Sequence, residues 1–332
     1  MSNGGVAFQH FGRQLQPRAT YDLRGDGQRI AGFFYGEPLP AIAVETIAAD
    51  QKAPQLREFS VSLEQWPNEI VSARIAPSLA GLGLLEAIPE SRIIALADPE
   101  DEDNDGISGR VHWVTTANRR DIGRFGWKAP HPTVAAQTAD AFLNDIGITS
   151  ELNPDESCTP MQSDCALQHS GDGPGGDHEI NGALFQAVVD FTASIAVPAA
   201  RPVTLEVKRG KQLFTDIGCH SCHTPSHDLV VNGPTERIWP YTDLLLHDMG
   251  PLLADGLAEG DASGGEWRTP PLWALGASAE LNPRTGFLHD GRAATVHEAI
   301  LWHGGEGAKA AANFSVLKPS DQDALAAFVL AL

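Results

Sequence analysis

Two cysteines and the histidine that follows the second form the most informative short pattern in the sequence. The segment Cys219-His220-Ser221-Cys222-His223 matches the CxxCH pattern by which c-type haem is attached. In that chemistry both thiols add to the vinyl groups of the porphyrin, and the next imidazole ligates the iron. Two intervening residues place both sulfurs along one edge of the ring. The spacing therefore predicts haem c bound by Cys219, Cys222 and His223.

The same pentapeptide allows two other interpretations. An ordinary structural zinc site needs a second ligand pair at suitable spacing, and apart from scattered histidines the sequence offers none. A thioredoxin-like CxxC pair follows a strand and has no ligating histidine after it. Haem is the first hypothesis, and a zinc-binding module without enzymatic activity stays open as an alternative.

The iron of a c-type haem usually takes a sixth ligand. Methionine in that position raises the reduction potential of the iron relative to histidine. Of the three methionines, Met249 lies downstream of the motif in an expected loop and is the first candidate, although methionine is also an ordinary apolar filler. Its rivals are His247, His289 and His303. A peroxidase that reduces hydrogen peroxide would instead keep the position open, with an acid or base such as His247 or His289 beside it.

Composition limits the partners that we expect. The 332 residues carry 23 basic and 43 acidic side chains, a net charge of -20, which repels phosphate backbones and anionic lipid surfaces. Nucleic acid is therefore not an expected partner, whereas a basic redox partner protein is. No stretch approaches the roughly 18 uninterrupted apolar residues of a membrane span. With 33 glycines and 23 prolines, much of the chain is expected to be loop.

Helix signals surround the CxxCH segment. Apolar residues at spacings of three and four predict an amphipathic helix over 180–197: Leu184, Val188, Phe191 and Ile195. A second helix is predicted over 204–217, ended by Gly218, so the cysteines follow a helix C-terminus. Two capping-box pairs predict helix starts closer to the chain end: Thr295 with Glu298, and Ser320 with Asp323.

These elements predict a mainly α protein with irregular loops. Residues 198–332 are expected to form a cytochrome c-like helical haem domain, because a helix before the motif and another at the chain end are what a small haem-wrapping domain requires. Residues 1–197 are expected to form a loop-rich N-terminal domain that contains an acidic loop over 98–109.

The acidic loop has the opening of a calcium site. Asp101, Asp103 and Asp105 could turn alternate oxygens toward one cation, and Gly106 would make the turn. The twelfth position is His112, so the usual bidentate glutamate is missing. A solvated acidic turn is the alternative.

Longer strings over nearly the whole chain resemble one bacterial family. They include GLGLLEAIPE, NDGISGR, RFGWKA, CTPMQSDC, PYTDLLLHDMGP, EWRTPPLWALG, FLHDGRA and ILWHGGE. They resemble the di-haem c-type thiol oxidoreductase-like proteins, distant relatives of di-haem cytochrome c peroxidases and MauG-type proteins. The resemblance implies a c-type cytochrome that moves single electrons, as part of a di-haem oxidoreductase.

The resemblance also implies a first haem on a CxxCH near the N-terminus, which this sequence lacks. Its start resembles the part of the family that follows that motif. We therefore expect 1–197 to be the remnant of the first haem domain, in a chain truncated after the first haem motif, with one haem here and a second in full-length relatives. The family's home is the periplasm, although no secretion signal is visible here.

Several further residues gain a role through the resemblance. In an oxidising compartment Cys158 and Cys165 are expected to form a disulfide, with a redox-active thiol pair as the alternative. Leu288 stands where peroxidase relatives often have methionine, which favours Met249 as the sixth ligand. Trp127 could lie against a haem or simply pack. Two arginines could pair with haem propionates or form surface salt bridges: Arg268 and Arg292.

Overall fold

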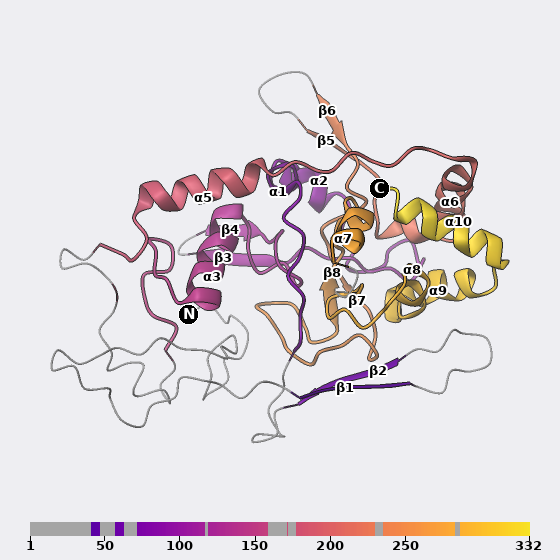
Figure 1. Cartoon of the computed structure of the whole chain (residues 1–332), viewed down its shortest axis with the longest axis horizontal. Coiled ribbons are helices and arrows are strands. Elements are labelled where there is room, and N and C mark those ends of the chain that lie inside the picture. The colour runs from indigo at the N-terminus through magenta and orange to yellow at the C-terminus, as the bar shows by residue number, and fades with distance from the viewer. Residues whose placement is uncertain are drawn as a thin grey trace.

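Helices joined by long irregular segments make up most of the chain. The computed structural model describes residues 72–116, 119–158, 171, 177–229, 235–282 and 286–332, with the backbones of 41–46 and 57–62. The α-helices in these ranges are α1 (Leu82–Glu86), α2 (Glu90–Ile94), α3 (Val134–Ile146), α5 (Gly182–Ser194), α6 (Leu205–Asp216), α7 (Leu275–Leu281), α8 (Val296–Leu301), α9 (Ala308–Ser315) and α10 (Pro319–Val329) (Figure 1). Two short 3-10 turns are η1 (Cys219–Ser221) and η2 (Gly305–Gly307).

The strands in the described ranges pair only as separate antiparallel hairpins. They are β1 (Ala41–Thr46) with β2 (Arg57–Ser62), β3 (Trp113–Thr116) with β4 (Arg119–Ile122), β5 (His227–Leu229) with β6 (Glu236–Ile238), and β7 (Leu246–Asp248) with β8 (Glu266–Arg268). The expectation of a mainly α protein with irregular loops is confirmed at this level. No helix in the described part of the chain is both long and apolar enough to cross a bilayer.

Helices α6 and α10 pack against each other at one end of the molecule (Figure 1). Their contact is close because α6 has Gly210 at the crossing, where a Cβ atom would overlap the carbonyl oxygen of Ala324. The core around the crossing is apolar and buried, and includes Leu213, Phe214, Leu325 and Phe328. This crossing holds α6, which leads directly into the CxxCH segment, against α10.

The predicted ends of α6 are confirmed. The Thr204 side chain accepts a hydrogen bond from the Val207 N–H at 3.1 Å and caps the helix start. Gly218, immediately after the C-cap, has φ of 97°, the left-handed conformation that glycine adopts without a steric penalty. The chain therefore turns directly from α6 into η1, which contains the first cysteine.

The two predicted capping boxes have different outcomes. Thr295 caps α8 by accepting from the Glu298 N–H at 3.1 Å, as predicted. The start predicted from Ser320 is wrong, because α10 begins at Pro319, with Lys318 as an N-cap that provides no side-chain bond. Proline is pre-organised for the first helical position, so it sets this start without a capping side chain.

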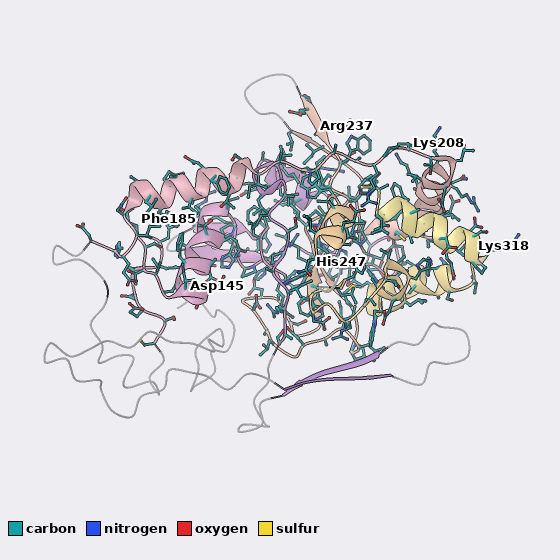
Figure 2. All side chains as sticks on the ribbon, viewed as in Figure 1. Asp145, Phe185, Lys208, Arg237, His247 and Lys318 are labelled. Atoms are coloured by element: carbon teal, nitrogen blue, oxygen red, sulfur yellow. The ribbon has the colours of Figure 1, made fainter. Side chains whose placement is uncertain are left out.

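Helix α5 confirms the predicted helix but not the predicted buried face. The side chains that it buries are Phe185 and Val189, whereas Leu184 is 55% and Phe191 68% exposed. The reason is its neighbours: α5 packs on α1 and α3 through the Phe185 side. Figure 2 labels Phe185 on this helix.

Backbone hydrogen bonds join the segments before and after Pro198. Arg110 and Leu246 exchange bonds of 3.0 and 2.8 Å in an isolated antiparallel bridge. The Arg268 N–H donates to the Trp127 carbonyl at 2.9 Å. These bonds attach the β7–β8 hairpin to Arg110, directly after the acidic loop, and to the segment around Trp127.

Candidate haem site

A cavity of about 1170 Å³ is the larger of two cavities among the described residues. Its walls come from segments on both sides of Pro198 and are mostly apolar, with side chains such as Phe142, Phe214, Leu272 and Leu325. Among them stand all three residues of the predicted haem site, Cys219, Cys222 and His223. Figure 2 shows His247, another wall residue, between the α3–α5 end and the α6–α10 end.

The two thiols follow directly from the end of α6. Cys219 begins η1, and the His223 N–H donates to the Cys219 carbonyl at 3.0 Å, which closes the pentapeptide into a compact turn. Both thiols are free. Burial raises the pKa of Cys219 to about 12 and also raises that of Cys222. The thiols are therefore protonated at neutral pH, which does not favour thiolate chemistry.

The His223 ring is oriented for metal binding through one nitrogen. Its Nδ1 lies 3.1 Å from the Tyr241 carbonyl oxygen, and because a carbonyl can only accept, Nδ1 carries the proton. The Nε2 atom then has its lone pair free. Burial, followed by the charge of His303, lowers the pKa of His223 to about 4. The ring is neutral, as a metal ligand must be.

Met249 and His303, two candidates for the second side of the iron, both line the cavity and are partly buried. Met249 packs against a small apolar cluster that includes Leu253 and Trp302. The His303 Nδ1 donates to the Ala299 carbonyl at 2.8 Å. The structure thus brings both residues to the cavity that contains His223.

His247 is held between two carboxylates and has no free nitrogen. Its Nε2 bonds Asp243 at 2.9 Å and its Nδ1 bonds Glu306 at 2.7 Å. Burial opposes a charge here, but the two carboxylates outweigh it and raise the pKa of His247 well above its usual value. Its Nδ1 also lies 3.6 Å from the Cys222 sulfur. We expect a charged residue that braces the thiol rather than an iron ligand.

His289 is engaged in an aromatic stack. Its ring lies on Trp267 with centroids 3.7 Å apart and an interplanar angle of 14°. Trp127 meets His289 edge-on at 6.3 Å and donates from Nε1 to the Ile75 carbonyl at 2.7 Å. Burial lowers the pKa of His289 to about 4, against the opposing effect of Asp290. All three rings line the cavity, so Trp127 combines a packing role with a position on the cavity wall.

The two arginines that the sequence offered as propionate partners have different surroundings in the structure. Arg268 is buried, lines the cavity, and donates to the carbonyls of Gly126 and Thr269. Among the described residues no carboxylate forms an ion pair with it, and burial lowers its pKa to about 10. Arg292 instead pairs with Asp290 at 2.6 Å. A buried guanidinium that forms no ion pair within the described ranges suits a propionate, so Arg268 fits that role, whereas Arg292 forms an internal salt bridge.

The acidic loop gathers three carboxylates. In the described part of the chain, one group of three thiol, imidazole or carboxylate ligand atoms lies within 4.8 Å of one another: Asp98, Asp101 and Asp103. Asp105 is not a member of this group; its Oδ1 accepts from the Ile107 N–H at 2.8 Å. Asp98 was missed in the sequence because it precedes the calcium-like pattern. The CxxCH segment forms no such group, which weakens the zinc alternative.

The predicted disulfide lies partly outside the described residues. Cys158 is disulfide-bonded, and Cys165 is outside the described ranges. The bond removes Cys158 as a haem thiol. Because residues 1–332 contain four cysteines and one CxxCH segment, they fit one covalent haem and do not fit a second.

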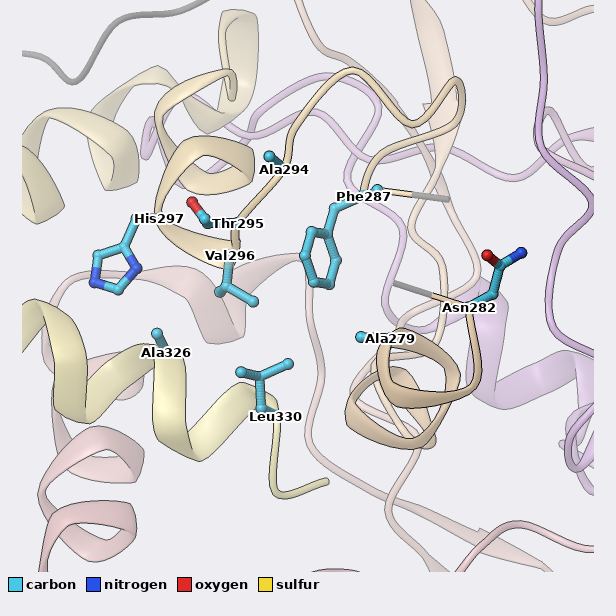
Figure 3. Close-up of a pocket in the computed structure, with 10 residues that line it drawn as sticks. Ala279, Asn282, Phe287, Ala294, Thr295, Val296, His297, Ala326 and Leu330 are labelled. Carbon is cyan, nitrogen blue, oxygen red and sulfur yellow. The ribbon is translucent and has the colours of Figure 1, made fainter. Parts of the chain in front are cut away.

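A second, smaller cavity carries no comparable chemistry. It has a volume of about 310 Å³ and lies among α7, α8 and α10, where Phe287, Val296 and Leu330 point into it (Figure 3). Its single imidazole, His297, bonds the exposed Asp323 at 3.1 Å. This cavity is a packing gap beside the large one.

Paired thiols and an adjacent imidazole in an apolar cavity define the class of c-type haem sites. Residues 54–332 match the family described as "Di-haem oxidoreductase, putative peroxidase". The chain therefore belongs to this family of haem oxidoreductases, which confirms the resemblance in the sequence.

Two other comparisons add little. No curated protein gives a significant match to the chain. A solved structure of hydrazine synthase from Kuenenia stuttgartiensis, pressurised with xenon, aligns over 80% of this chain and 95% of its own, with 15% identity and a TM-score of 0.34. At this TM-score the likeness supports no statement about fold or function.

Proposed function

We propose that this protein is a c-type cytochrome that transfers single electrons through one covalent haem. The observation that carries the proposal is the joint position of Cys219, Cys222 and His223 on one large apolar cavity. When bound, the haem would supply an iron that alternates between two oxidation states. The chain would hold it by two thioethers, orient the His223 ring through the Tyr241 carbonyl, and exclude water with apolar walls.

Other residues would tune the environment of that haem. Arg268 would neutralise a propionate from its buried position, and His247 would keep the Cys222 side of the cavity polar and charged. Met249 is the sixth ligand expected from the sequence. The net charge of -20 favours a basic redox partner, since complementary charges steer protein encounters.

Maturation in a haem-attaching host tests the proposal. We expect one haem per chain by pyridine haemochrome assay, with a mass increase of one haem in the intact protein. The double substitution of Cys219 and Cys222 to serine should abolish covalent attachment. The matched control is Ser221→Ala, between the two thiols, which should load normally. A wild-type protein without covalent haem would refute the proposal.

A peroxidase is the second candidate, because the family description names that activity. It requires an open iron position, whereas a carrier has both axial positions filled. Stopped-flow mixing of the ferric protein with hydrogen peroxide separates the two. A carrier should show no fast change in the haem spectrum.

We propose the periplasm as its location. Covalent haem attachment and the disulfide at Cys158 both suit an oxidising compartment. In that setting residues 198–332 would form the cytochrome c-like haem domain, preceded by the loop-rich N-terminal domain.

Calcium is a further proposal, at Asp98, Asp101 and Asp103. Calcium at a hundredfold excess over its Kd should stabilise the wild type by about 2.7 kcal/mol. Replacing Asp101 and Asp103 by asparagine should remove that gain in a thermal unfolding assay with and without the ion. Asp105→Asn is the control and should keep the gain, because Asp105 lies outside the cluster. Equal gains in all three proteins would contradict this site.

A further inference from the structure

We propose that His303, rather than Met249, would be the second side chain, with His223, to hold the haem iron. This inference rests on the haem attachment proposed above and gives the iron two imidazole ligands. In the sequence, His303 was one of three histidines considered as alternatives to Met249 for the sixth ligand. It also closes the iron position that a peroxidase would need.

The hydrogen bonds of the two rings support this assignment. His223 donates from Nδ1 to the Tyr241 carbonyl, and His303 donates from Nδ1 to the Ala299 carbonyl at 2.8 Å. Among the described residues neither Nε2 has a hydrogen-bond partner. Metal-ligating histidines characteristically donate their other ring N–H to a carbonyl or carboxylate, which fixes the tautomer and the ring orientation. Both rings are therefore prepared to bind metal through Nε2.

The two rings also belong to the same cavity, because both His223 and His303 line its wall. The rival His247 has both nitrogens bonded to carboxylates, and His289 is stacked on Trp267.

Met249 has an adequate explanation as a packing residue. Its side chain packs against Leu253, Ala293 and Trp302. Beside it Gly307 leaves little room, because a Cβ atom there would lie 3.2 Å from the Met249 methyl carbon and 3.0 Å from the His303 Cβ. Met249 therefore fills the space beside the histidine and helps to hold it.

Spectra of matured holoproteins test the assignment. The ferric wild type should be low-spin and lack the near-infrared charge-transfer band of a methionine-ligated haem. Met249→Leu should leave the spectrum unchanged. His303→Ala should lose the low-spin electron paramagnetic resonance signal, and added imidazole should restore it, which a merely structural role would not produce. His303→Met conserves a ligand and should introduce the missing band with an upward shift in potential.

Each contrary outcome has a distinct meaning. A wild-type methionine band that disappears in Met249→Leu would overturn the proposal, as would a low-spin spectrum in His303→Ala identical to that of the wild type. If His303→Ala does not fold, the band expected in His303→Met decides the question. Absence of covalent haem in every variant, measured by pyridine haemochrome assay, would refute the proposed function itself and is recognisable before any ligand is assigned.

Discussion

The substitution Gly210→Ala is expected to destabilise the folded protein by about 3 kcal/mol or more, at the upper end of overpacking effects. The new Cβ would overlap the carbonyl oxygen of Ala324 and lie 2.6 Å from its carbonyl carbon and 2.7 Å from the Phe328 Cβ. Two of these atoms belong to backbone, so α6 or α10 must move. Because α6 leads directly into the CxxCH turn, the yield of haem-loaded protein should fall as well.

Denaturant unfolding followed by circular dichroism measures the loss, and haem absorbance per chain measures the yield. The matched control is Gly182→Ala, the same change at the start of α5. There the Cβ would meet the Glu151 carboxylate at 3.2 Å, which is the end of a flexible side chain. Its stability should change by no more than about 1 kcal/mol. Equal effects from both substitutions would show that the α6–α10 contact is not close.

The second large effect is expected for His247→Leu, which should destabilise the protein by about 3 to 5 kcal/mol at neutral pH. The change leaves the carboxylates of Asp243 and Glu306 buried without their shared cation; their side chains are 2% and 10% exposed. The same substitution at His297 is the control. His297 pairs with the exposed Asp323, and loss of such a surface pair costs about 0 to 1 kcal/mol.

The pH dependence of this difference follows from the two directions of pKa shift. The folded pKa of His247 is raised, so its contribution is complete below the unfolded value of about 6.5 and is lost as pH rises through the folded value. The folded pKa of Glu306 is lowered, so its contribution is complete above the unfolded value of about 4.3 and is lost as pH falls. The free energy of unfolding of the wild type and of His247→Leu should therefore be measured across pH. The two proteins should differ most between about pH 4.3 and about pH 6.5, where both contributions are complete. A difference that is constant with pH would contradict the ionic interpretation.

Local chemistry explains which parts of the fold were predictable. The ends of α6 depend on Thr204 and Gly218, which lie within or next to the helix that they terminate. The CxxCH segment is likewise contiguous, so the haem hypothesis could be formed without the fold. Pro319 outweighed the Ser320 signal, because one residue's ring geometry decided that start.

The features of the fold and the site that the sequence did not predict depend on contacts between segments far apart in the chain. The buried side of α5 is set by α1 and α3, so its apolar spacing did not identify Phe185 and Val189 as the core residues. The partners of His247 include Glu306, 59 positions away. The free Nε2 of His303 and its place on the cavity that His223 also lines are properties of the folded chain, and the sequence only included His303 among several rivals.

The hydrogen bonds of Glu306 extend from the cavity to the acidic loop. Its carboxylate accepts from the N–H and the hydroxyl of Ser108 as well as from His247. A graft of residues 198–332 onto another protein would transfer the thiols and His223 but leave behind Ser108, Trp127 and part of the wall. The transplanted pentapeptide would then face solvent on one side, so residues 198–332 alone cannot reproduce this pocket.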